Sequence, residues 1–191
     1  MKTELIFATN NIHKIDEIKP LLPIGINIIS LDQLLFFEDI PETGNTLKEN
    51  ALQKARFIYN KFERNCFADD TGLEIDALSG RPGVYSARYA GEHCSFVDNV
   101  NKVLEEMKYE NNRKARFRTV IALIYNDIEY FFEGVVEGEI LLDYAGVVGF
   151  GYDPIFKPVN QLYSFAEMPL VEKNKISHRS IAAQKLVDFL K

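Results

Sequence analysis

The sequence predicts an α/β fold in which helices pack on a mixed β-sheet. Short apolar segments typical of buried strands alternate along the chain with segments whose apolar residues recur every three or four positions. Segments 116–125 and 128–136 flank Asn126-Asp127, an arrangement typical of an antiparallel hairpin. Such a hairpin argues against an all-parallel sheet. No Pro/Gly/Ser-rich linker divides the 191 residues, so we expect a single domain spanning residues 1–191.

The helices are predicted from their apolar periodicity and from residues at their ends. Thr46 and Glu49 have the spacing of a capping box at the start of the second helix. Pro23 and Gly25 end the first helix. The predicted helices span 12–22, 47–62, 96–107 and a last segment that begins near residue 177.

The strands are predicted from short apolar or alternating runs bounded by turn-forming residues. These strands span 5–8, 26–30, 66–68, 73–76, 116–125 and 128–136, and 138–142 continues the sheet. Asp69-Asp70-Thr71-Gly72 interrupts the apolar run, and Asp and Gly are common where strands stop. We therefore expect Asp69 and Asp70 to be displayed at the end of a strand.

Composition excludes several classes of protein. With 47% hydrophobic and 26% charged residues, the chain is typical of a globular protein. The net charge of -6 argues against a nucleic-acid binder, although a local basic cluster can still bind a small anion. Cys66 and Cys94 lack the spacing of a zinc site or a disulfide framework. Without a signal-type segment or an apolar run of about 18 residues, we expect a cytoplasmic protein with no membrane partner.

Three carboxylates are candidate ligands for Mg²⁺. Asp69 and Asp70 are adjacent, and Glu42 lies in a tight loop before the capped helix. Mg²⁺ is usually held by one or two carboxylates, with substrate phosphates and water completing its coordination. The alternative interpretation is a solvated turn for the aspartates and an ordinary surface charge for Glu42.

A donor-rich segment lies at the predicted start of the first helix. It consists of Thr9, Asn10, Asn11, Ile12, His13 and Lys14. The unpaired N–H groups and the dipole of a helix N-terminus favour an anion such as phosphate. Lys54, beside the buried stripe of the second helix, is a further candidate cation. The alternative is that these residues only cap the helix and that Lys14 is solvated.

Gly149-Phe150-Gly151-Tyr152-Asp153-Pro154 is a candidate base-binding segment. It lacks the last glycine of a dinucleotide-binding fingerprint, and the chain has no P-loop motif. If Phe150 faces a groove, its ring can stack on a base while Asp153 accepts hydrogen bonds from ring N–H groups. The alternative places Phe150 in the core.

A basic, polar run at residues 172–179 precedes the last helix and contains Lys173, His178 and Arg179. Its donors suit a keto oxygen or a phosphate. The alternative is a solvated helix start.

Taken in order, the motifs resemble those of the inosine triphosphate pyrophosphatases, also called XTP/dITP pyrophosphatases, over essentially the whole chain. The matching segments are Ala-Thr-Asn-Asn-x-x-Lys at 8–14, Pro-Glu-Thr-Gly-Asn-Thr-x-x-Glu-Asn-Ala at 41–51, Ala-Asp-Asp-Thr-Gly-Leu at 68–73, Pro-Gly-Val-Tyr-Ser-Ala-Arg-Tyr at 82–89, Gly-Phe-Gly-Tyr-Asp-Pro at 149–154 and Ser-His-Arg at 177–179. Two departures are Pro41, where many members have an acidic residue, and Ser180, where many have glycine.

The resemblance implies a mixed α/β fold with two lobes around a central groove, usually assembled as a homodimer. It implies Mg²⁺-dependent hydrolysis of deaminated purine nucleoside triphosphates (ITP, dITP and XTP) to the monophosphate and pyrophosphate, which cleanses the nucleotide pool.

The resemblance also implies roles for individual residues. Asp70 would activate water, with Asp69 and Glu42 close to the metal. The implied triphosphate-binding residues are Thr9, Asn11, Lys14 and Lys54, and neighbouring Asn10, Ile12, His13 and Thr71 are included among the substrate contacts. Phe150 would stack on the base within the segment that also holds Gly151 and Tyr152. The residues implied to read the edge of the base are Asp153, Lys173, His178 and Arg179.

A 6-keto purine offers an acceptor where adenine offers a donor, so donors from His178 and Arg179 would be satisfied only by the former. A mismatch of buried polar groups can discriminate by about 10⁴-fold.

Two other functions compete with this one. Asp70-Thr71-Gly72 is also the triplet of aspartic proteases, in which two carboxylates share a proton, but a single copy would need a dimer to complete the dyad. A nucleotide-binding sensor without turnover would keep the base and phosphate contacts and need no water activator. Intact Asp69, Asp70 and Glu42 argue against a sensor.

Overall fold

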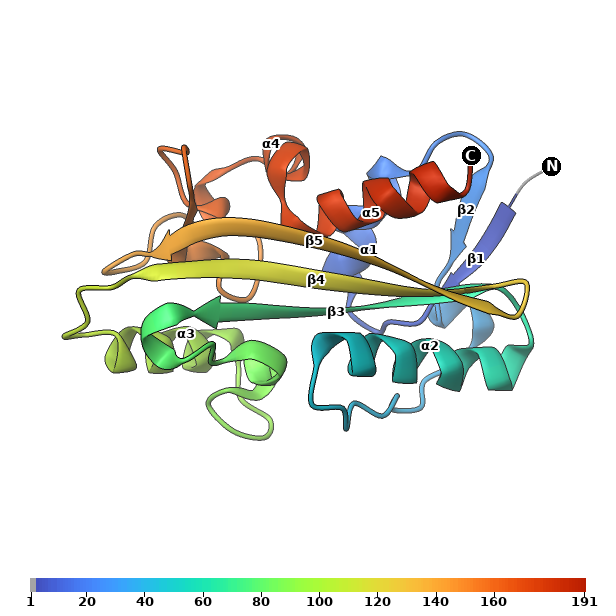
Figure 1. The fold of residues 1–191 in the computed structure, drawn as a ribbon, viewed down its shortest axis with the longest axis horizontal. Helices are drawn as coiled ribbons and strands as arrows, with labels where there is room; N and C mark the ends of the chain where they lie inside the picture. Colours follow the sequence, from blue (N-terminus) through green and yellow to red (C-terminus); the bar gives the residue numbers. More distant parts are fainter. Residues whose placement is uncertain (1–2) are drawn as a thin grey trace. The chain divides into compact units, whose positions relative to one another are not determined.

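The computed structural model describes residues 3–191, which form a mixed six-stranded sheet with packed helices (Figure 1). The strand order is β2-β1-β3-β4-β5-β6. Strand β1 pairs in parallel with both β2 and β3, whereas β5 and β6 are antiparallel. The predicted fold class is therefore confirmed in its mixed sheet and packed helices.

The boundaries of the elements are as follows. The strands are β1 (Thr3–Phe7), β2 (Ile26–Ile29), β3 (Cys66–Ile75), β4 (Lys114–Tyr125), β5 (Ile128–Ile140) and β6 (Phe156–Pro158). The α-helices are α1 (Ile12–Ile18), α2 (Leu47–Phe62), α3 (Phe96–Glu106), α4 (Leu170–Ile176) and α5 (His178–Phe189). No helix within residues 3–191 is both long and apolar enough to cross a membrane.

The chain divides into two compact units. Of the described residues, unit 1 contains 3–70, 119–134 and 179–191, and unit 2 contains 71–118 and 135–178. Strand β3 passes from unit 1 to unit 2 between Asp70 and Thr71. The groove expected between two lobes stays a prediction.

Unit 1 has a core in which β1 and β3 pack side by side. Phe7 and Phe67 are partners in the parallel register, and their rings stack with centroids 4.4 Å apart. Ala182 and Leu186 of α5 belong to the same buried cluster as these rings. The core thus fixes β3 against β1 and packs α5 near them.

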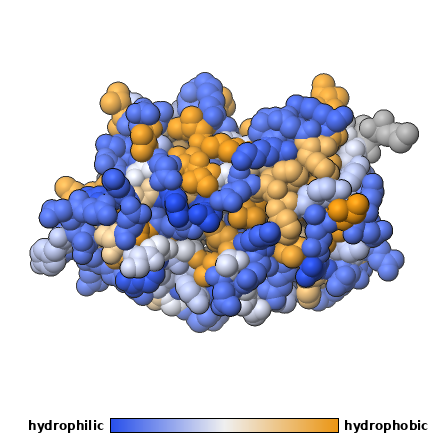
Figure 2. Space-filling model, viewed as in Figure 1, coloured by the Kyte–Doolittle hydropathy of each residue, from blue (hydrophilic) through white to orange (hydrophobic). Residues whose placement is uncertain are grey.

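Unit 2 has a second core rich in aromatic rings. Phe117 of β4 contacts Phe156 of β6 edge-on, with centroids 4.6 Å apart. Phe165, which is fully buried, lies 5.4 Å from Phe156 by the same measure. Apolar side chains also reach the surface near α4, as Figure 2 shows, and among them Val171 is 71% exposed.

Most of the elements agree with the sequence prediction. Helix α2 has the predicted ends, and Thr46 caps it by accepting a hydrogen bond from the backbone of Glu49. The β4–β5 turn has positive φ at both Asn126 (50°) and Asp127 (65°), as a two-residue hairpin of the primed type requires. Helix α1 ends earlier than predicted, because Pro20 lies in a short 3₁₀ turn that follows it.

The predicted end of a strand at Asp69 and Asp70 is wrong. Residues 66–75 form one continuous strand, β3, and both aspartates lie within it. Asp and Gly disfavour strands, but neighbouring strands hold β3 in the sheet, and buried cations neutralise Asp69 and Asp70. The tertiary environment therefore overrides the local preference. The sequence also failed to predict the short elements β6 and α4 as separate elements.

Candidate active site

Asp69 and Asp70 lie where β3 extends past the end of β1. Strand β1 stops at Phe7, whose partner on β3 is Phe67, so the next residues of β3 lie beyond the carboxyl end of β1. Ligand sites of open α/β sheets commonly form at such carboxyl ends. The topology of unit 1 therefore places the two adjacent aspartates where polar side chains can gather.

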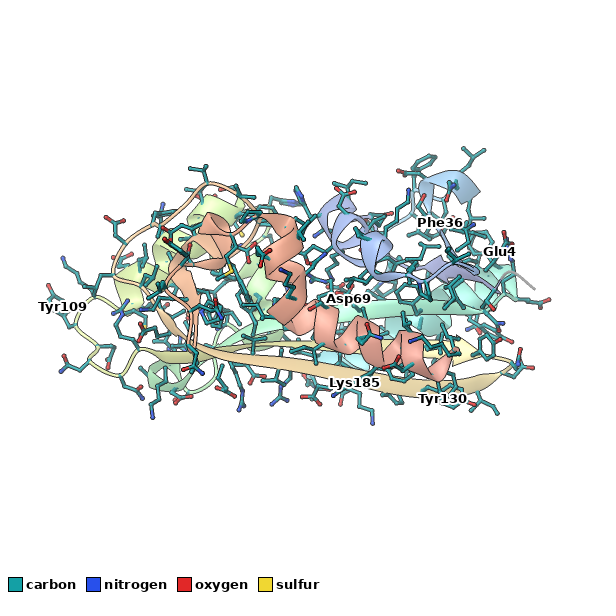
Figure 3. All side chains as sticks on the ribbon, turned by 90° about the horizontal axis from the view of Figure 1, so that it is seen from above. Glu4, Phe36, Asp69, Tyr109, Tyr130 and Lys185 are labelled. Atoms are coloured by element: carbon teal, nitrogen blue, oxygen red, sulfur yellow. The ribbon has the colours of Figure 1, made fainter. Side chains whose placement is uncertain are left out.

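The carboxylate of Asp69 is buried between two cations. Its Oδ1 accepts a hydrogen bond from Lys14 Nζ at 2.9 Å, and its Oδ2 accepts one from Arg179 Nε at 3.1 Å. Arg179 also donates to the buried carboxylate of Glu17. Burial raises the pKa of Asp69, but Lys14 and Arg179 outweigh it and hold that pKa well below its ordinary value. Asp69, which is labelled in Figure 3, is therefore an anion held between two cations.

Asp70 has a different environment. Its Oδ1 lies 3.3 Å from Lys54 Nζ, and its Oδ2 accepts a hydrogen bond from Asn50 Nδ2 at 3.2 Å. Burial raises the pKa of Asp70 above its ordinary value, and the negative charge of Glu42 adds to that shift, while Lys54 opposes it. Asp70 therefore accepts a proton more readily than Asp69, its neighbour in the strand.

Lys54 joins two carboxylates. Its ammonium group donates to both Glu42 and Asp70, and its side chain is only 6% exposed. Burial lowers the pKa of Lys54, but attraction to Asp70 and Glu42 outweighs burial and raises that pKa. Carboxylates from a loop and a strand thus converge on one cationic atom.

Asn50 connects the loop that carries Glu42 to strand β3. Its Oδ1 accepts a hydrogen bond from the Gly44 N–H at 2.7 Å, while its Nδ2 donates to Asp70. Gly44 is required for this close approach, because a Cβ at that position would lie 2.8 Å from Asn50 Oδ1 and 2.6 Å from Glu49 Cβ. The loop and Asp70 are therefore held by one side chain.

The segment before α1 is arranged as a helix cap. Asn11 accepts a hydrogen bond from the backbone of His13 at 3.0 Å, and Thr9 Oγ1 accepts one from the backbone of Asn11 at 3.2 Å. Asn10, Ile12 and His13 are exposed, whereas Thr9 is buried. Capping and phosphate binding are compatible, because both use the N-terminal end of the helix.

Unit 2 contains the second group of predicted residues. Asp153 Oδ2 accepts hydrogen bonds from the Phe150 N–H at 2.9 Å and from Lys173 Nζ at 2.6 Å. Both members of the Asp153–Lys173 ion pair have side chains 3% exposed. Lys173 Nζ also lies 5.3 Å from the centroid of the Phe150 ring. The buried Asp153–Lys173 ion pair therefore contacts Phe150 in two ways, by a hydrogen bond to its backbone and by the nearby ammonium group at its ring.

Three other predicted residues of unit 2 lie in different surroundings. The ring of His178 is buried and stacks on Phe117, with centroids 4.5 Å apart. Tyr152 donates a hydrogen bond from its hydroxyl to the Ser86 carbonyl at 2.9 Å, and burial raises the pKa of Tyr152 well above its ordinary value. Gly151 has a positive φ of 61°, which suits the tight turn before Asp153.

The predicted residues thus form two groups. Unit 1 contains Thr9, Asn10, Asn11, Ile12, His13, Lys14, Glu42, Lys54, Asp69, Asp70 and Arg179. Unit 2 contains Thr71, Phe150, Gly151, Tyr152, Asp153, Lys173 and His178. Arg179, predicted to read the edge of a base, has its guanidinium in the unit 1 network with Asp69 and Glu17.

The sequence prediction omitted Glu17 and Phe165 and gave Asn50 no role in the site, although the structure joins all three to these groups. Glu17 lies three positions after Lys14 in α1, and Asn50 lies four positions before Lys54 in α2, so helical spacing could have indicated both. Phe165 lies with its ring centroid 5.4 Å from Lys173 Nζ. No sequence pattern distinguishes Phe165 from an ordinary core residue.

Comparison with known proteins finds relatives over nearly the whole chain. The Ham1 family model matches residues 5–189. The dITP/XTP pyrophosphatase of Flavobacterium johnsoniae is 52% identical over 187 residues, which cover 98% of this chain and 97% of that protein. The dITP/XTP pyrophosphatase of Porphyromonas gingivalis is 52% identical over 188 residues, covering 98% of this chain and 97% of that protein.

Solved structures agree with the sequence relatives. The Ham1 protein of Staphylococcus aureus superimposes with a TM-score of 0.89 at 39% identity, covering 98% of each chain. A HAM1 protein from Coxiella burnetii gives a TM-score of 0.90 at 39% identity, also covering 98% of each chain. The chain therefore belongs to the Ham1 family, and the resemblance to XTP/dITP pyrophosphatases is confirmed.

Proposed function

We propose that this chain hydrolyses deaminated purine nucleoside triphosphates, namely ITP, dITP and XTP, to the nucleoside monophosphate and pyrophosphate. The activity named for its relatives supports this proposal. The observation that carries it is the pair of carboxylates, Glu42 and Asp70, that converge on Lys54 in unit 1. Phosphoryl chemistry needs such neighbouring charges to bind a polyanion and to activate water.

The triphosphate is bound in this proposal by the cations and backbone donors of unit 1. Lys14 and Lys54 supply ammonium groups, and the N-terminal end of α1 supplies N–H donors. Thr9, Asn10, Asn11, Ile12 and His13 form the segment that approaches the phosphates. Arg179 holds one oxygen of Asp69, and the other oxygen of Asp69 holds Lys14.

Asp70 is the proposed general base. General base catalysis needs a carboxylate that is held in one orientation. Asn50 and Lys54 orient its two oxygens. Asp69 lies close to this site, and its hydrogen bonds to Lys14 and Arg179 support a positioning role for it.

The residues of unit 1 fit a magnesium ion. Within residues 3–191 no group of three or more His, Cys, Asp or Glu side chains is placed to hold a metal, but Mg²⁺ commonly uses only one or two carboxylates. Glu42 and Asp70 would hold the ion, because their oxygens already converge on the cationic Lys54. A bound Mg²⁺ supplies positive charge to the phosphate oxygens.

The base is bound in this proposal by unit 2. The ring of Phe150 stacks on the purine, and the segment of Gly151, Tyr152 and Thr71 borders it. Lys173 and His178 donate hydrogen bonds to a 6-keto oxygen. Adenine has an amino group at that position, so these donors would be left unpaired.

The two units act together as one nucleoside-triphosphate pyrophosphatase domain spanning residues 1–191. The protein works as a homodimer in the cytoplasm, where nucleoside triphosphates are made and used. An aspartic protease is a poorer fit, because Asp70 faces Lys54 and Asn50, whereas a protease dyad needs a second carboxylate sharing its proton.

A panel of nucleoside triphosphates tests the proposal. Purified protein is incubated with Mg²⁺ and, separately, ITP, XTP, dITP, GTP, ATP and CTP, and the initial rate of pyrophosphate release is measured. We expect kcat/KM for ITP and XTP to exceed that for ATP by about 10³- to 10⁴-fold. Equal rates for ITP and ATP would contradict the proposed selectivity, and no release from any of them would contradict the activity.

A further inference from the structure

The loop formed by residues 42–45 carries Glu42, and each of its four residues is bonded to a side chain of α2. In loop order, the pairs are Glu42 with Lys54, Thr43 with Gln53, Gly44 with Asn50 and Asn45 with Glu49. Successive residues of the loop thus meet successively earlier positions of the helix, so the loop runs antiparallel to the first two turns of α2. Helix α2 therefore fixes the path of the backbone that carries Glu42.

The bonds between Thr43 and Gln53 fix the backbone directly next to Glu42. The Thr43 N–H donates to Gln53 Oε1 at 2.9 Å, and Gln53 Nε2 donates to Thr43 Oγ1, also at 2.9 Å. Glutamine can make both bonds because its amide group carries an acceptor and donors side by side. The two bonds close a ring, which restricts the rotation of Thr43 as well as its position.

The loop backbone lies directly against α2 at the next residue. A Cβ at Gly44 would lie 2.6 Å from Glu49 Cβ and 3.0 Å from the backbone nitrogen of Asn50. Real Cβ atoms essentially never approach other atoms closer than 3.0 Å. Close contact therefore limits movement of the loop toward the helix, and the bonds of Gln53 oppose movement away from it.

Glu42 needs this support because burial holds it only in part. Its side chain is 33% exposed, whereas the Lys54 side chain that it meets is 6% exposed. A partly exposed loop residue opens more easily than a residue of the core, because fewer packed contacts hold it. The hydrogen bonds of the adjacent backbone therefore contribute to where the Glu42 carboxylate lies.

We propose that Gln53 is a positioning residue that holds the Glu42 carboxylate where it can bind a divalent cation together with Asp70. The inference rests on the proposed function, because Glu42 and Asp70 are the groups assigned there to Mg²⁺. Gln53 acts on the backbone of the loop through Thr43. Its removal should therefore weaken the response to the metal ion and leave binding of the base in unit 2 unchanged.

Gln53→Met tests this role. Methionine keeps the length of the side chain and suits a helix as well as glutamine does, but it removes both hydrogen bonds to Thr43. We expect amide hydrogen exchange of residues 42–45 in the metal-free protein to become about 10-fold faster. The Mg²⁺ concentration that gives half the maximal rate of pyrophosphate release from ITP should rise about 3- to 10-fold, with an unchanged KM for ITP at saturating Mg²⁺.

Gln184→Met is the matched control. Gln184 is also a glutamine on a helix of unit 1, and it donates from its exposed side chain to Asp188 at 2.9 Å. Both the exchange of residues 42–45 and the Mg²⁺ dependence should stay at wild-type values in this variant. The proposal would be overturned if Gln53→Met matched Gln184→Met in either measurement.

Thr43→Val and the double variant show whether Gln53 acts through Thr43. Valine keeps the shape of threonine and its backbone N–H but lacks Oγ1. If Gln53 acts through this residue, the double variant needs a Mg²⁺ concentration within about twofold of that needed by Gln53→Met, because the second substitution has no bond left to remove. Increases that multiply would mean that Gln53 acts elsewhere, and the proposal would be overturned.

Metal binding without turnover distinguishes failure of this inference from failure of the proposed function. Mn²⁺ is titrated into the nucleotide-free wild-type protein and Gln53→Met, and free Mn²⁺ is measured by electron paramagnetic resonance. If the wild-type protein releases no pyrophosphate from ITP, the proposed function fails and this titration decides the inference. Weaker Mn²⁺ binding by Gln53→Met would then support the positioning role. Equal binding by the two proteins, or no binding by the wild type, would overturn it.

Discussion

The two units use buried Asp–Lys pairs in different ways. In unit 1, Asp69 and Lys14 belong to a network that extends through Arg179 to Glu17. In unit 2, Asp153 and Lys173 form a pair bordered by aromatic rings. A network of many charges suits a polyanion and a metal ion, whereas a pair between rings suits a flat, weakly polar base. This difference is the reason that our proposal assigns phosphate chemistry to unit 1 and base recognition to unit 2.

The largest expected effect is the loss of turnover in Asp70→Asn. An amide cannot take a proton from water, so we expect kcat with ITP to fall by about 10²- to 10⁴-fold. Binding of inosine monophosphate, measured by calorimetry, should persist because unit 2 is unchanged. Asp16→Asn, at an exposed position of α1, is the control and should keep wild-type kcat. Unimpaired turnover in Asp70→Asn would show that another group is the base.

Asp69→Asn should instead act on stability. Removing a buried anion leaves Lys14 and Arg179 without their partner, and breaking such a pair lowers the free energy of unfolding by about 3 to 5 kcal/mol. Urea denaturation at pH 7 measures this change.

The matched comparison is Asp70→Asn, because the two residues are neighbours in β3 with opposite pKa shifts. A carboxyl group whose pKa is raised in the folded state is a source of instability when ionised, so its replacement should not lower stability at pH 7. Because the pKa of Asp69 is depressed, its stabilising effect is present at neutral pH and disappears as the pH falls below the ordinary aspartate range. Equal destabilisation by the two substitutions would break the distinction between them.

Phe150→Ala should weaken the binding of every purine base. Loss of a stacking partner removes about 1 to 3 kcal/mol, which corresponds to a rise in KM of roughly 5- to 150-fold. Tyr109→Ala is the control, because Tyr109 is 87% exposed in a loop of unit 2 (Figure 3). A KM unchanged from that of the control would assign Phe150 to packing alone.

The smallest expected effect concerns the two cysteines, one in each unit. Cys66 is fully buried, and burial raises the pKa of its thiol to about 12, whereas Cys94 of unit 2 is half-buried. At pH 8 a thiol-reactive disulfide should therefore label only Cys94 in the native protein, and both cysteines in protein unfolded by urea.

The same burial makes the stability of the protein depend on pH. Because the raised pKa disfavours the thiolate in the folded state, the contribution of Cys66 to stability falls as the pH rises above about 8.5. Rapid labelling of both thiols would contradict the tight core of unit 1.

Much of the fold could be predicted from local pattern, and the failures have a common cause. Helix α2 was predictable because its cap and its apolar stripe are local features. The strand end predicted at Asp69 and Asp70 was wrong because cations distant in sequence, Lys14, Lys54 and Arg179, allow the strand to continue there. Local propensity cannot include partners that only the fold supplies.

The candidate site shows the same limit. The chemical types of Lys14, Glu42, Lys54 and Asp70 could be recognised from the sequence, and the structure brings them into one unit. The sequence could not reveal that Arg179 bonds Asp69 and Glu17, since their positions differ by more than 100 residues along the chain. Hydrogen-bond partners of buried charges therefore require the structure.

Identification of the phosphorus products tests the central claim most directly. Wild-type protein is incubated with ITP and Mg²⁺, and the ³¹P spectrum is followed as the substrate disappears. The account predicts inosine monophosphate and pyrophosphate in equal amounts from the first time point. Appearance of orthophosphate with inosine diphosphate would contradict it.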